Sequence, residues 1–252
     1  MCLLVIAFGI DRDYPLIVAG NRDEFHARPT SPARWWQDAP DTLGGRDLLA
    51  GGTWLALHRR GRFAAVTNYR DAVPADPSLR SRGHLVTGFL QSELDPLAYL
   101  ETVDPEAYAG FNLLVSDGTA LAYLGNRGPR ARELEPGIYG LSNATLDTPW
   151  TKVERSKRRL EALLDEADAD DAKLLDLLGN RDLGPVEEAD DDRLPPQIAH
   201  AITAPFIVQP EYGTRCSTVV RGVPGQRWSL VERRFDADGQ TTGESRYAFD
   251  VA

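Results

Sequence analysis

The chain has 252 residues, of which 42% are hydrophobic and 26% are charged, as in a globular protein with a sizeable core. The formal net charge of -10 argues against a nucleic-acid partner or an anionic membrane surface, because neither attracts a negative protein. This charge leaves room for a local basic pocket, and the length allows one large domain or two small ones.

Cysteine usage is sparse, with Cys2 and Cys216 as the two thiols. A disulfide framework is therefore excluded, one bridge between the two remains open, and a reducing cytoplasmic location is expected. The apolar run at residues 3–10 is too short to span a membrane, and no basic residue precedes it as in a signal peptide. We therefore expect no membrane span.

The first predicted elements are two short strands at residues 2–10 and 16–20, rich in Val, Ile and Leu and separated by turn-forming residues. Together they predict a β-hairpin that is covered on both faces. Pairing of the two strands would return the tetrad Asn-Arg-Asp-Glu at residues 21–24 toward Cys2.

Beyond this hairpin, residues 25–41 contain three prolines and show no periodicity, which predicts a long loop. Further strand-like runs lie at residues 53–58, 62–69, 111–116, 120–124, 137–143, 217–221, 228–235 and 242–249. Helical periodicity predicts two helices between residues 81 and 109 and two more at 153–167 and 171–178. Thr148, followed by Pro149, is the expected N-cap of the third helix.

The order is strands, two helices, strands, two helices, strands. Helices grouped between hairpins favour an antiparallel α+β fold with helical layers on two sheets. We see no repeat, low-complexity segment or domain boundary, so we predict a single domain over residues 1–252.

Metal or cofactor binding has little support in the sequence. The histidines at positions 26, 58, 84 and 200 are scattered, without i, i+4 pairs or a neighbouring CxxC. The acidic run at residues 190–192 lacks the alternating ligands of a calcium loop, so we interpret it as solvated charge. We predict neither a metal site nor a bound cofactor.

The chemistry of this chain is expected at Cys2. If Met1 is removed, Cys2 carries a thiol and a free α-amine on one carbon. Reference pKa values of about 8.5 for the thiol and about 7.7 to 8.0 for the amine let the neutral amine accept the thiol proton near neutral pH, without a histidine. The alternative interpretation is a small buried strand residue, since free cysteine is often buried.

Several motifs along the chain point to one family. In order, they are Cys2-Leu3-Leu4, Asn21-Arg22-Asp23-Glu24 with Phe25 and Arg28-Pro29, Gly51-Gly52-Thr53-Trp54-Leu55, Thr67-Asn68-Tyr69-Arg70, Leu141-Ser142-Asn143, Leu146-Asp147-Thr148-Pro149-Trp150 with Lys152, and Tyr212-Gly213-Thr214-Arg215. The chain thereby resembles the NRDE proteins, also called the transport and Golgi organisation family, over essentially its whole length. That family is similar in turn to N-terminal-nucleophile hydrolases of the bile salt hydrolase and penicillin V acylase branch. This resemblance implies a four-layer αββα sandwich.

The resemblance also assigns roles near the amino terminus. Cys2 matches the nucleophile, Asp23 matches the carboxylate that orients the α-amine, and Arg22 matches an arginine that steadies the thiolate. Alternatively, Arg22 and Asp23 form a structural ion pair that fixes the hairpin. Neighbours in a strand also point to opposite faces, unless residues 21–24 form a turn.

Three later residues are assigned in the same way. Asn68 and Asn143 match two asparagines near the nucleophile, one in the oxyanion hole and one that contacts the substrate or the α-amine. Arg215 matches a late arginine that supports the site electrostatically. Each asparagine could instead satisfy backbone groups at a strand end.

Two functions of different classes follow. The first is a cytoplasmic cysteine amidohydrolase or acyltransferase that acts on an acyl amide or thioester. The second is a binding or trafficking protein that keeps the hydrolase scaffold and holds a hydrophobic ligand such as haem or an acyl-coenzyme A. The second rests on the lipid and haem handling of animal relatives that the resemblance brings with it.

Overall fold

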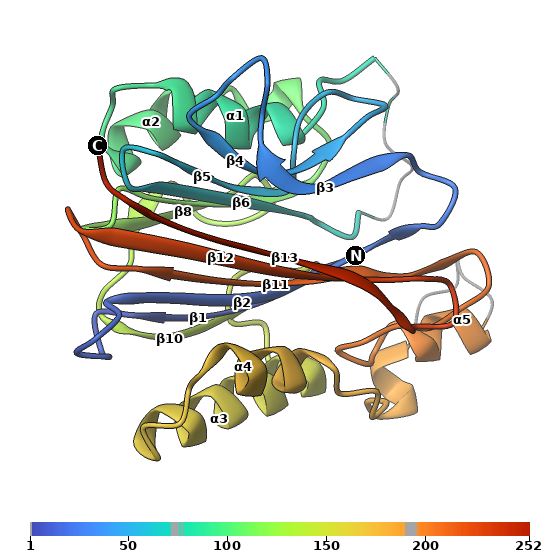
Figure 1. Cartoon of the computed structure of the whole chain (residues 1–252). Helices are drawn as coiled ribbons and strands as arrows, with labels where there is room; N and C mark the ends of the chain where they lie inside the picture. The colour runs from blue at the N-terminus through green and yellow to red at the C-terminus, as the bar shows by residue number, and fades with distance from the viewer. Residues whose placement is uncertain (1, 72–75, 77, 190–195) are drawn as a thin grey trace.

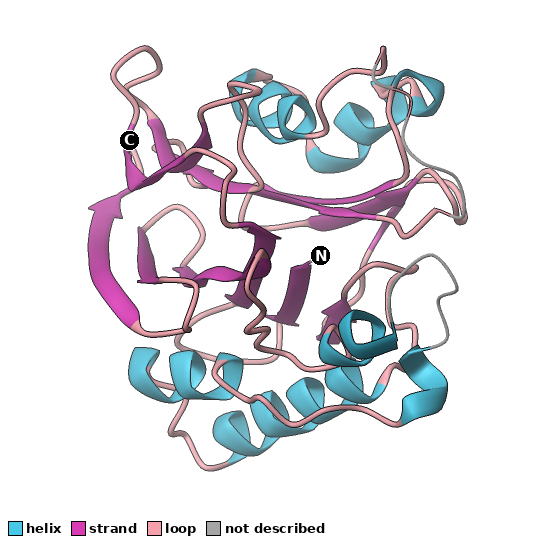
Figure 2. Cartoon of the chain, turned by 90° about the vertical axis from the view of Figure 1, so that its right-hand side faces the viewer, coloured by secondary structure: helices cyan, strands magenta, loops and turns pink. Residues whose placement is uncertain are grey.

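The chain forms two antiparallel sheets stacked face to face, with helices on both outer faces (Figure 1). The computed structural model describes residues 2–71, 76, 78–189 and 196–252, so the acidic run at 190–192 lies outside the described residues. Turned by 90°, the molecule shows helices above and below the strands and the amino terminus near its middle (Figure 2). The predicted α+β four-layer αββα sandwich is confirmed.

Sheet A holds the amino-terminal hairpin. Its strand order is β10-β1-β2-β11-β12-β13. The strands are β1 (Cys2–Phe8), β2 (Leu16–Phe25), β10 (Gly137–Leu141), β11 (Tyr212–Gly222), β12 (Arg227–Phe235) and β13 (Thr241–Asp250). The predicted pairing of β1 with β2 is confirmed, and β2 extends through the tetrad at residues 21–24.

Sheet B consists of seven strands in sequence order from β3 to β9. They are β3 (Thr30–Trp35), β4 (Thr42–Asp47), β5 (Leu55–His58), β6 (Arg62–Asn68), β7 (Phe111–Ser116), β8 (Leu121–Gly125) and β9 (Arg132–Glu133). The expected loop at residues 25–41 is wrong in part, because β3 lies within it. This strand lies at the edge of the sheet beside β4 and has an irregular register around Pro32, which an edge strand tolerates.

Helices cover both outer faces of the sandwich. Sheet B carries α1 (Gly83–Gln91) and α2 (Pro96–Thr102), whereas sheet A carries α3 (Thr151–Asp165) and α4 (Asp171–Leu178). These four helices were predicted. Three shorter elements were not: α5 (Pro196–Ala201) and the 3-10 turns Pro105–Ala107 and Val186–Ala189. Among the described residues, no helix is long and apolar enough to cross a membrane.

The start of α3 differs from the prediction. Trp150, not Thr148, is the N-cap residue, and its side chain makes no capping hydrogen bond. Instead, the Glu188 carboxylate accepts from the backbone N–H of Thr151 at 2.9 Å and from its hydroxyl at 2.6 Å. The helix is thus capped by a residue 37 positions away, which local sequence does not reveal.

Alternation along β1 explains the two apolar layers. Leu4, Ile6 and Phe8 point into the core between the sheets, whereas Val5 and Ala7 point toward α3 and α4. Because side chains alternate along a strand, the side chain of Cys2 continues the face between the sheets. The core therefore ends at the amino-terminal end of β1, where the candidate site begins.

Candidate active site

A cavity of about 450 Å³ opens between the two sheets at the amino-terminal end of β1. Cys2, Arg22 and Asp23 line it from β1 and β2, Asn68 lines it from β6, and Arg215 lines it from β11. Five of the six predicted site residues thus meet at one cavity, although they come from four strands and both sheets.

The pairing register of β1, β2 and β11 explains which of their side chains line the cavity. Cys2 lies directly opposite Arg22, and Arg22 lies directly opposite Cys216. Directly paired residues share a face, so these three side chains form a row that lines the cavity. The two cysteines are two strand spacings apart, roughly 9.6 Å between Cα atoms, which exceeds the roughly 7 Å limit for a disulfide. Both thiols are free and buried, and the bridge left open by the sequence does not form.

Asp23 borders the cavity, but its side chain points to the opposite face of β2, and the residue is 4% exposed. Its Oδ1 accepts a hydrogen bond of 2.7 Å from the Thr214 hydroxyl, its direct partner on β11. Because Cys2 pairs with Arg22 in an antiparallel register, the amino end of Cys2 is directed toward Asp23. Burial raises the pKa of the Asp23 carboxyl, while Lys152, Thr214 and Arg22 act in the opposite direction.

The Cys2 thiol is 8% exposed, and burial raises its pKa. The negative charge of Asp23 raises this pKa further, whereas the backbone N–H of Asp23 and the charge of Arg22 lower it. Since the net effect is upward, the thiol carries its proton at neutral pH. A nucleophilic role therefore requires a nearby base to accept that proton.

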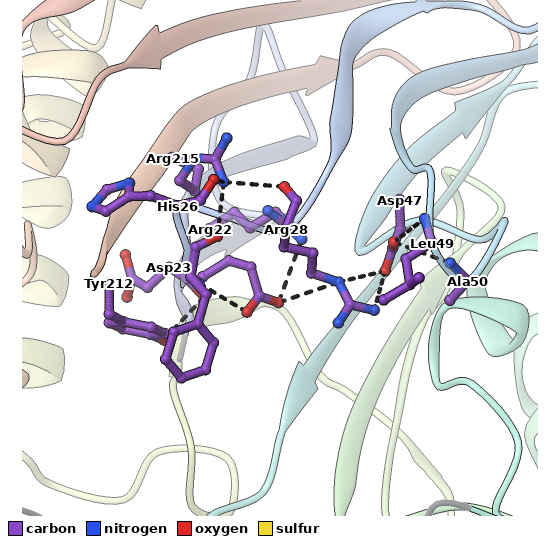
Figure 3. A network of polar contacts seen from close by, with 11 residues as sticks. Arg22, Asp23, His26, Arg28, Asp47, Leu49, Ala50, Tyr212 and Arg215 are labelled. Atoms are coloured by element: carbon purple, nitrogen blue, oxygen red, sulfur yellow. Dashed lines mark hydrogen bonds and ion pairs between the residues drawn. The ribbon is translucent and has the colours of Figure 1, made fainter. Parts of the chain in front are cut away.

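The two arginines of the site have different surroundings. The Arg22 guanidinium lies 3.5 Å from the Glu24 carboxylate, which is also on β2. Arg215 donates from Nη1 to three backbone carbonyls of the segment at residues 25–28, over 2.9 to 3.3 Å. Figure 3 shows Arg215 beside this segment and Arg28 extending from it to Asp47. Arg215 therefore fixes the backbone at the cavity edge as well as contributing charge.

Of the two predicted asparagines, one lines the cavity and the other is buried behind its wall. Asn68 ends β6 with an exposed side chain on the cavity, whereas Asn143 is 1% exposed and lies behind the wall. The Asn143 amide donates to the Asn68 carbonyl at 2.8 Å. Ser142 donates to the Cys2 carbonyl at 2.8 Å and contacts Asn143 Oδ1 at 3.1 Å. Asn143 and Ser142 thus tie the strand that carries Asn68 to the strand that carries Cys2.

The residue-by-residue prediction missed a buried lysine below the site. Lys152, in the first turn of α3, is 3% exposed and donates from Nζ to the Ile202 carbonyl at 3.0 Å. Burial lowers its pKa to about 8, and the charge of Asp23 acts in the opposite direction. Lys152 belongs to a motif that matches the family, two residues after Trp150, but the sequence prediction assigned it no role at the site.

Within the described ranges, no group of three or more His, Cys, Asp or Glu side chains could hold a metal ion. The polar groups around Cys2 are instead a carboxylate at its amino end, an amide across the cavity and guanidinium groups on the walls. Such a set suits a nucleophile that passes through an oxyanion.

Comparisons with known proteins place this geometry in context. Residues 1–237 match the model of the family described as Transport and Golgi organisation 2. A mouse protein named Transport and Golgi organization 2 homolog is 36% identical over 275 residues, covering 100% of this chain and 99% of that protein. A Drosophila melanogaster protein named Transport and Golgi organization protein 2 is 34% identical over 197 residues, covering 67% of each.

Two solved structures share the fold at low sequence identity. The C2A mutant of a conjugated bile acid hydrolase from Clostridium perfringens superposes with a TM-score of 0.54 at 9% identity, covering 99% of this chain and 92% of that one. A Caenorhabditis elegans ortholog of N-acylethanolamine-hydrolyzing acid amidase gives a TM-score of 0.50 at 10% identity, covering 86% and 92%. The sandwich is therefore of the N-terminal-nucleophile hydrolase type.

Proposed function

The chain belongs to the Transport and Golgi organisation 2 family, and from that premise we propose that it is a cysteine N-terminal-nucleophile hydrolase or acyltransferase. Its substrate is an acyl amide or thioester of a small molecule, and Cys2 attacks the carbonyl carbon once Met1 has been removed. The hydrolase-type fold and the names of the two solved neighbours, an acid amidase ortholog and a conjugated bile acid hydrolase, support this bond class.

In the proposed reaction the α-amine of Cys2 takes the thiol proton as sulfur attacks. A C–S bond forms and the carbonyl becomes an oxyanion, to which the Asn68 amide donates a hydrogen bond worth about 3 kcal/mol. The protonated amine, held by the Asp23 carboxylate, then gives its proton to the leaving amine or thiol as that bond breaks. Water or an acceptor amine cleaves the resulting thioester and regenerates the thiol.

One observation carries this proposal: the register that pairs Cys2 with Arg22 directs the amino end of Cys2 toward the buried Asp23 while its thiol lines the cavity. The positions of Arg22 and Arg215 on the same cavity agree with an electrostatic role for both.

The test is covalent labelling of Cys2. Protein purified from cells would be incubated with a panel of acyl amides and thioesters, and its intact mass and peptide map would be measured. We expect a chain that begins at Cys2 and an acyl adduct on that residue in the wild type and in Cys216→Ser, but not in Cys2→Ala. Retention of Met1 in cells, or turnover by Cys2→Ala, would overturn the proposal.

A second candidate is ligand binding without turnover. The raised pKa of Cys2 favours it, because a protonated thiol is a poor nucleophile in an unprocessed chain. The cavity would then hold a hydrophobic ligand such as haem or an acyl-coenzyme A. Tight binding of either without any product would support this candidate, and failure to bind both would contradict it.

A further inference from the structure

The cavity around Cys2 is basic, whereas the rest of the chain is acidic. Seven arginines and five carboxylates line the cavity, in a protein whose net charge is -10. The arginines are Arg22, Arg28, Arg46, Arg80, Arg82, Arg215 and Arg234. A cleft of one sign inside a molecule of the other sign concentrates ligands of opposite charge.

Four of these arginines already face a carboxylate. The pairs are Arg22 with Glu24 at 3.5 Å, Arg28 with Asp47 at 2.6 Å, Arg46 with Asp38 at 2.6 Å and Arg234 with Glu232 at 3.5 Å. Their charges are largely compensated within the protein. Outside these pairs the cavity is lined by three arginines and by two carboxylates, Asp23 and Asp76, so the excess positive charge comes from these three arginines.

Of those three, Arg215 donates to backbone carbonyls and Arg80 is exposed at the rim. Arg82 is different, because it is half-buried at the N-cap of α1 and donates from Nη1 to the Gly110 carbonyl at 3.1 Å. In the part of the chain that the structure describes, no carboxylate forms an ion pair with Arg82.

Arg82 lines the same cavity as Cys2. Burial lowers the pKa of this guanidinium, whereas Cys2 and the carboxylates of Glu24 and Asp71, which lie beyond ion-pair distance, act in the opposite direction. A cation removed from water without a carboxylate is costly, and an incoming anion would remove that cost. The planar guanidinium suits carboxylate and phosphate oxygens, which it can bind through two parallel hydrogen bonds.

We infer that Arg82 binds an anionic group, a carboxylate or a phosphate, on the molecule that reacts with Cys2, and that Arg80 attracts this group from the rim. The inference rests on the proposed function for the identity of Cys2 as the reacting atom. The charge preference itself follows from the cavity, so it can be measured without turnover.

The test compares two alkylating reagents of similar size, anionic iodoacetate and neutral iodoacetamide. With both, the sulfur forms a bond to carbon, iodide leaves and the thiol proton passes to solvent. The fraction of thiolate affects both rates equally, so their ratio reports the charge around the sulfur. The full-length chain carrying Cys216→Ser would be used, with N-acetylcysteine as the free-thiol reference and peptide mapping to locate the label.

We expect the iodoacetate-to-iodoacetamide rate ratio at Cys2 to exceed that of the free thiol by about tenfold. Arg82→Gln should bring it close to the free-thiol value, and Arg82→Lys should retain part of it. The matched control is Arg46→Gln, which should change the ratio by about twofold at most, because Asp38 already compensates that charge. A wild-type ratio equal to that of the free thiol, or an unchanged ratio in folded Arg82→Gln, would overturn the inference.

A second arm identifies the anion. Acetate and inorganic phosphate would each be added during alkylation by iodoacetamide. Protection by either supports the inference and names the group, whereas protection by neither contradicts it. Failure of acyl amides and thioesters to label Cys2 would count against the proposed function alone, since alkylation needs no acyl transfer.

Discussion

The two ends of the layer between the sheets are made by the same strands and yet differ in character. At the closed end, the inward faces of β1 and β12 carry Leu4, Ile6 and Trp228, all fully buried. At the open end, the same faces carry Cys2 and Glu232 beside a cavity. Stability and chemistry are thus separated along each strand by only a few residues.

The difference has a physical cause. Apolar side chains at the closed end pack because their removal from water is favourable, by about 25 cal/mol per Å² of buried surface. Charged groups at the open end lose hydration when buried, so sheets cannot close over them without partners for every charge. The open end therefore persists as a cavity. Substitutions at the closed end should therefore lower mainly the free energy of unfolding, and substitutions at the open end should lower mainly the labelling activity.

The largest contrast is expected between Cys2 and Leu4, which share one face of β1. Cys2→Ala should abolish acyl labelling and change the free energy of unfolding by about 1 kcal/mol at most. Leu4→Ala should cost about 3 to 5 kcal/mol while the folded fraction still reacts. Urea unfolding and intact-mass labelling of both variants would check this. A smaller loss of unfolding free energy in Leu4→Ala than in Cys2→Ala would contradict the assignment of stability to the closed end.

Asp23→Asn should lower the acylation rate without lowering the free energy of unfolding. We expect the acylation rate to fall by about 10² to 10⁴ because the amine loses its oriented partner. Burial raises the pKa of the Asp23 carboxyl, so the folded chain binds a proton at this carboxyl more tightly than the unfolded chain does. The wild type therefore loses stability as the pH rises through the pKa of Asp23 in the folded state. At pH 7 the variant should therefore be at least as stable as the wild type. A wild-type rate constant for acylation would contradict the assigned role.

Lys152, which is buried beneath the site, provides a test of how burial affects a charged group. Its pKa is about 8 in the folded protein and about 10.5 in the unfolded chain, so between these values only the unfolded chain holds the proton. Unfolding free energy should then rise with pH in the wild type, relative to Lys152→Met, by about 3 kcal/mol across that window. Denaturant titrations of both proteins between pH 7 and 10 measure the difference. Parallel curves would rule out the lowered pKa.

The smallest effect is expected at Ser142, whose hydroxyl holds the Cys2 carbonyl. Ser142→Ala should cost about 1 kcal/mol and lower the labelling rate by a few-fold, because β1 loses one of its restraints at the nucleophile. Ser78→Ala, which removes an exposed hydroxyl bound to Asp76, is the matched control and should change neither quantity. Equal behaviour of the two variants would show that Ser142 does not position Cys2.

Sequence patterns predicted the strands other than β3, β4 and β9, the helices α1 to α4, the amino-terminal hairpin and five of the residues that line the cavity. These features depend on local patterns, such as apolar runs, turn residues and short motifs, that each segment carries independently of the others.

The other features of the fold and the site depend on how distant segments pack in the tertiary structure. Packing placed β3 inside a predicted loop and paired it with β4, capped α3 with Glu188 and set Asn143 behind the cavity wall instead of on it. It also buried Lys152 and left Arg82 without a carboxylate in the described chain. The physical reason is that the effect of a polar group depends on its partners and on its distance from water. In this fold those partners come from residues far along the chain.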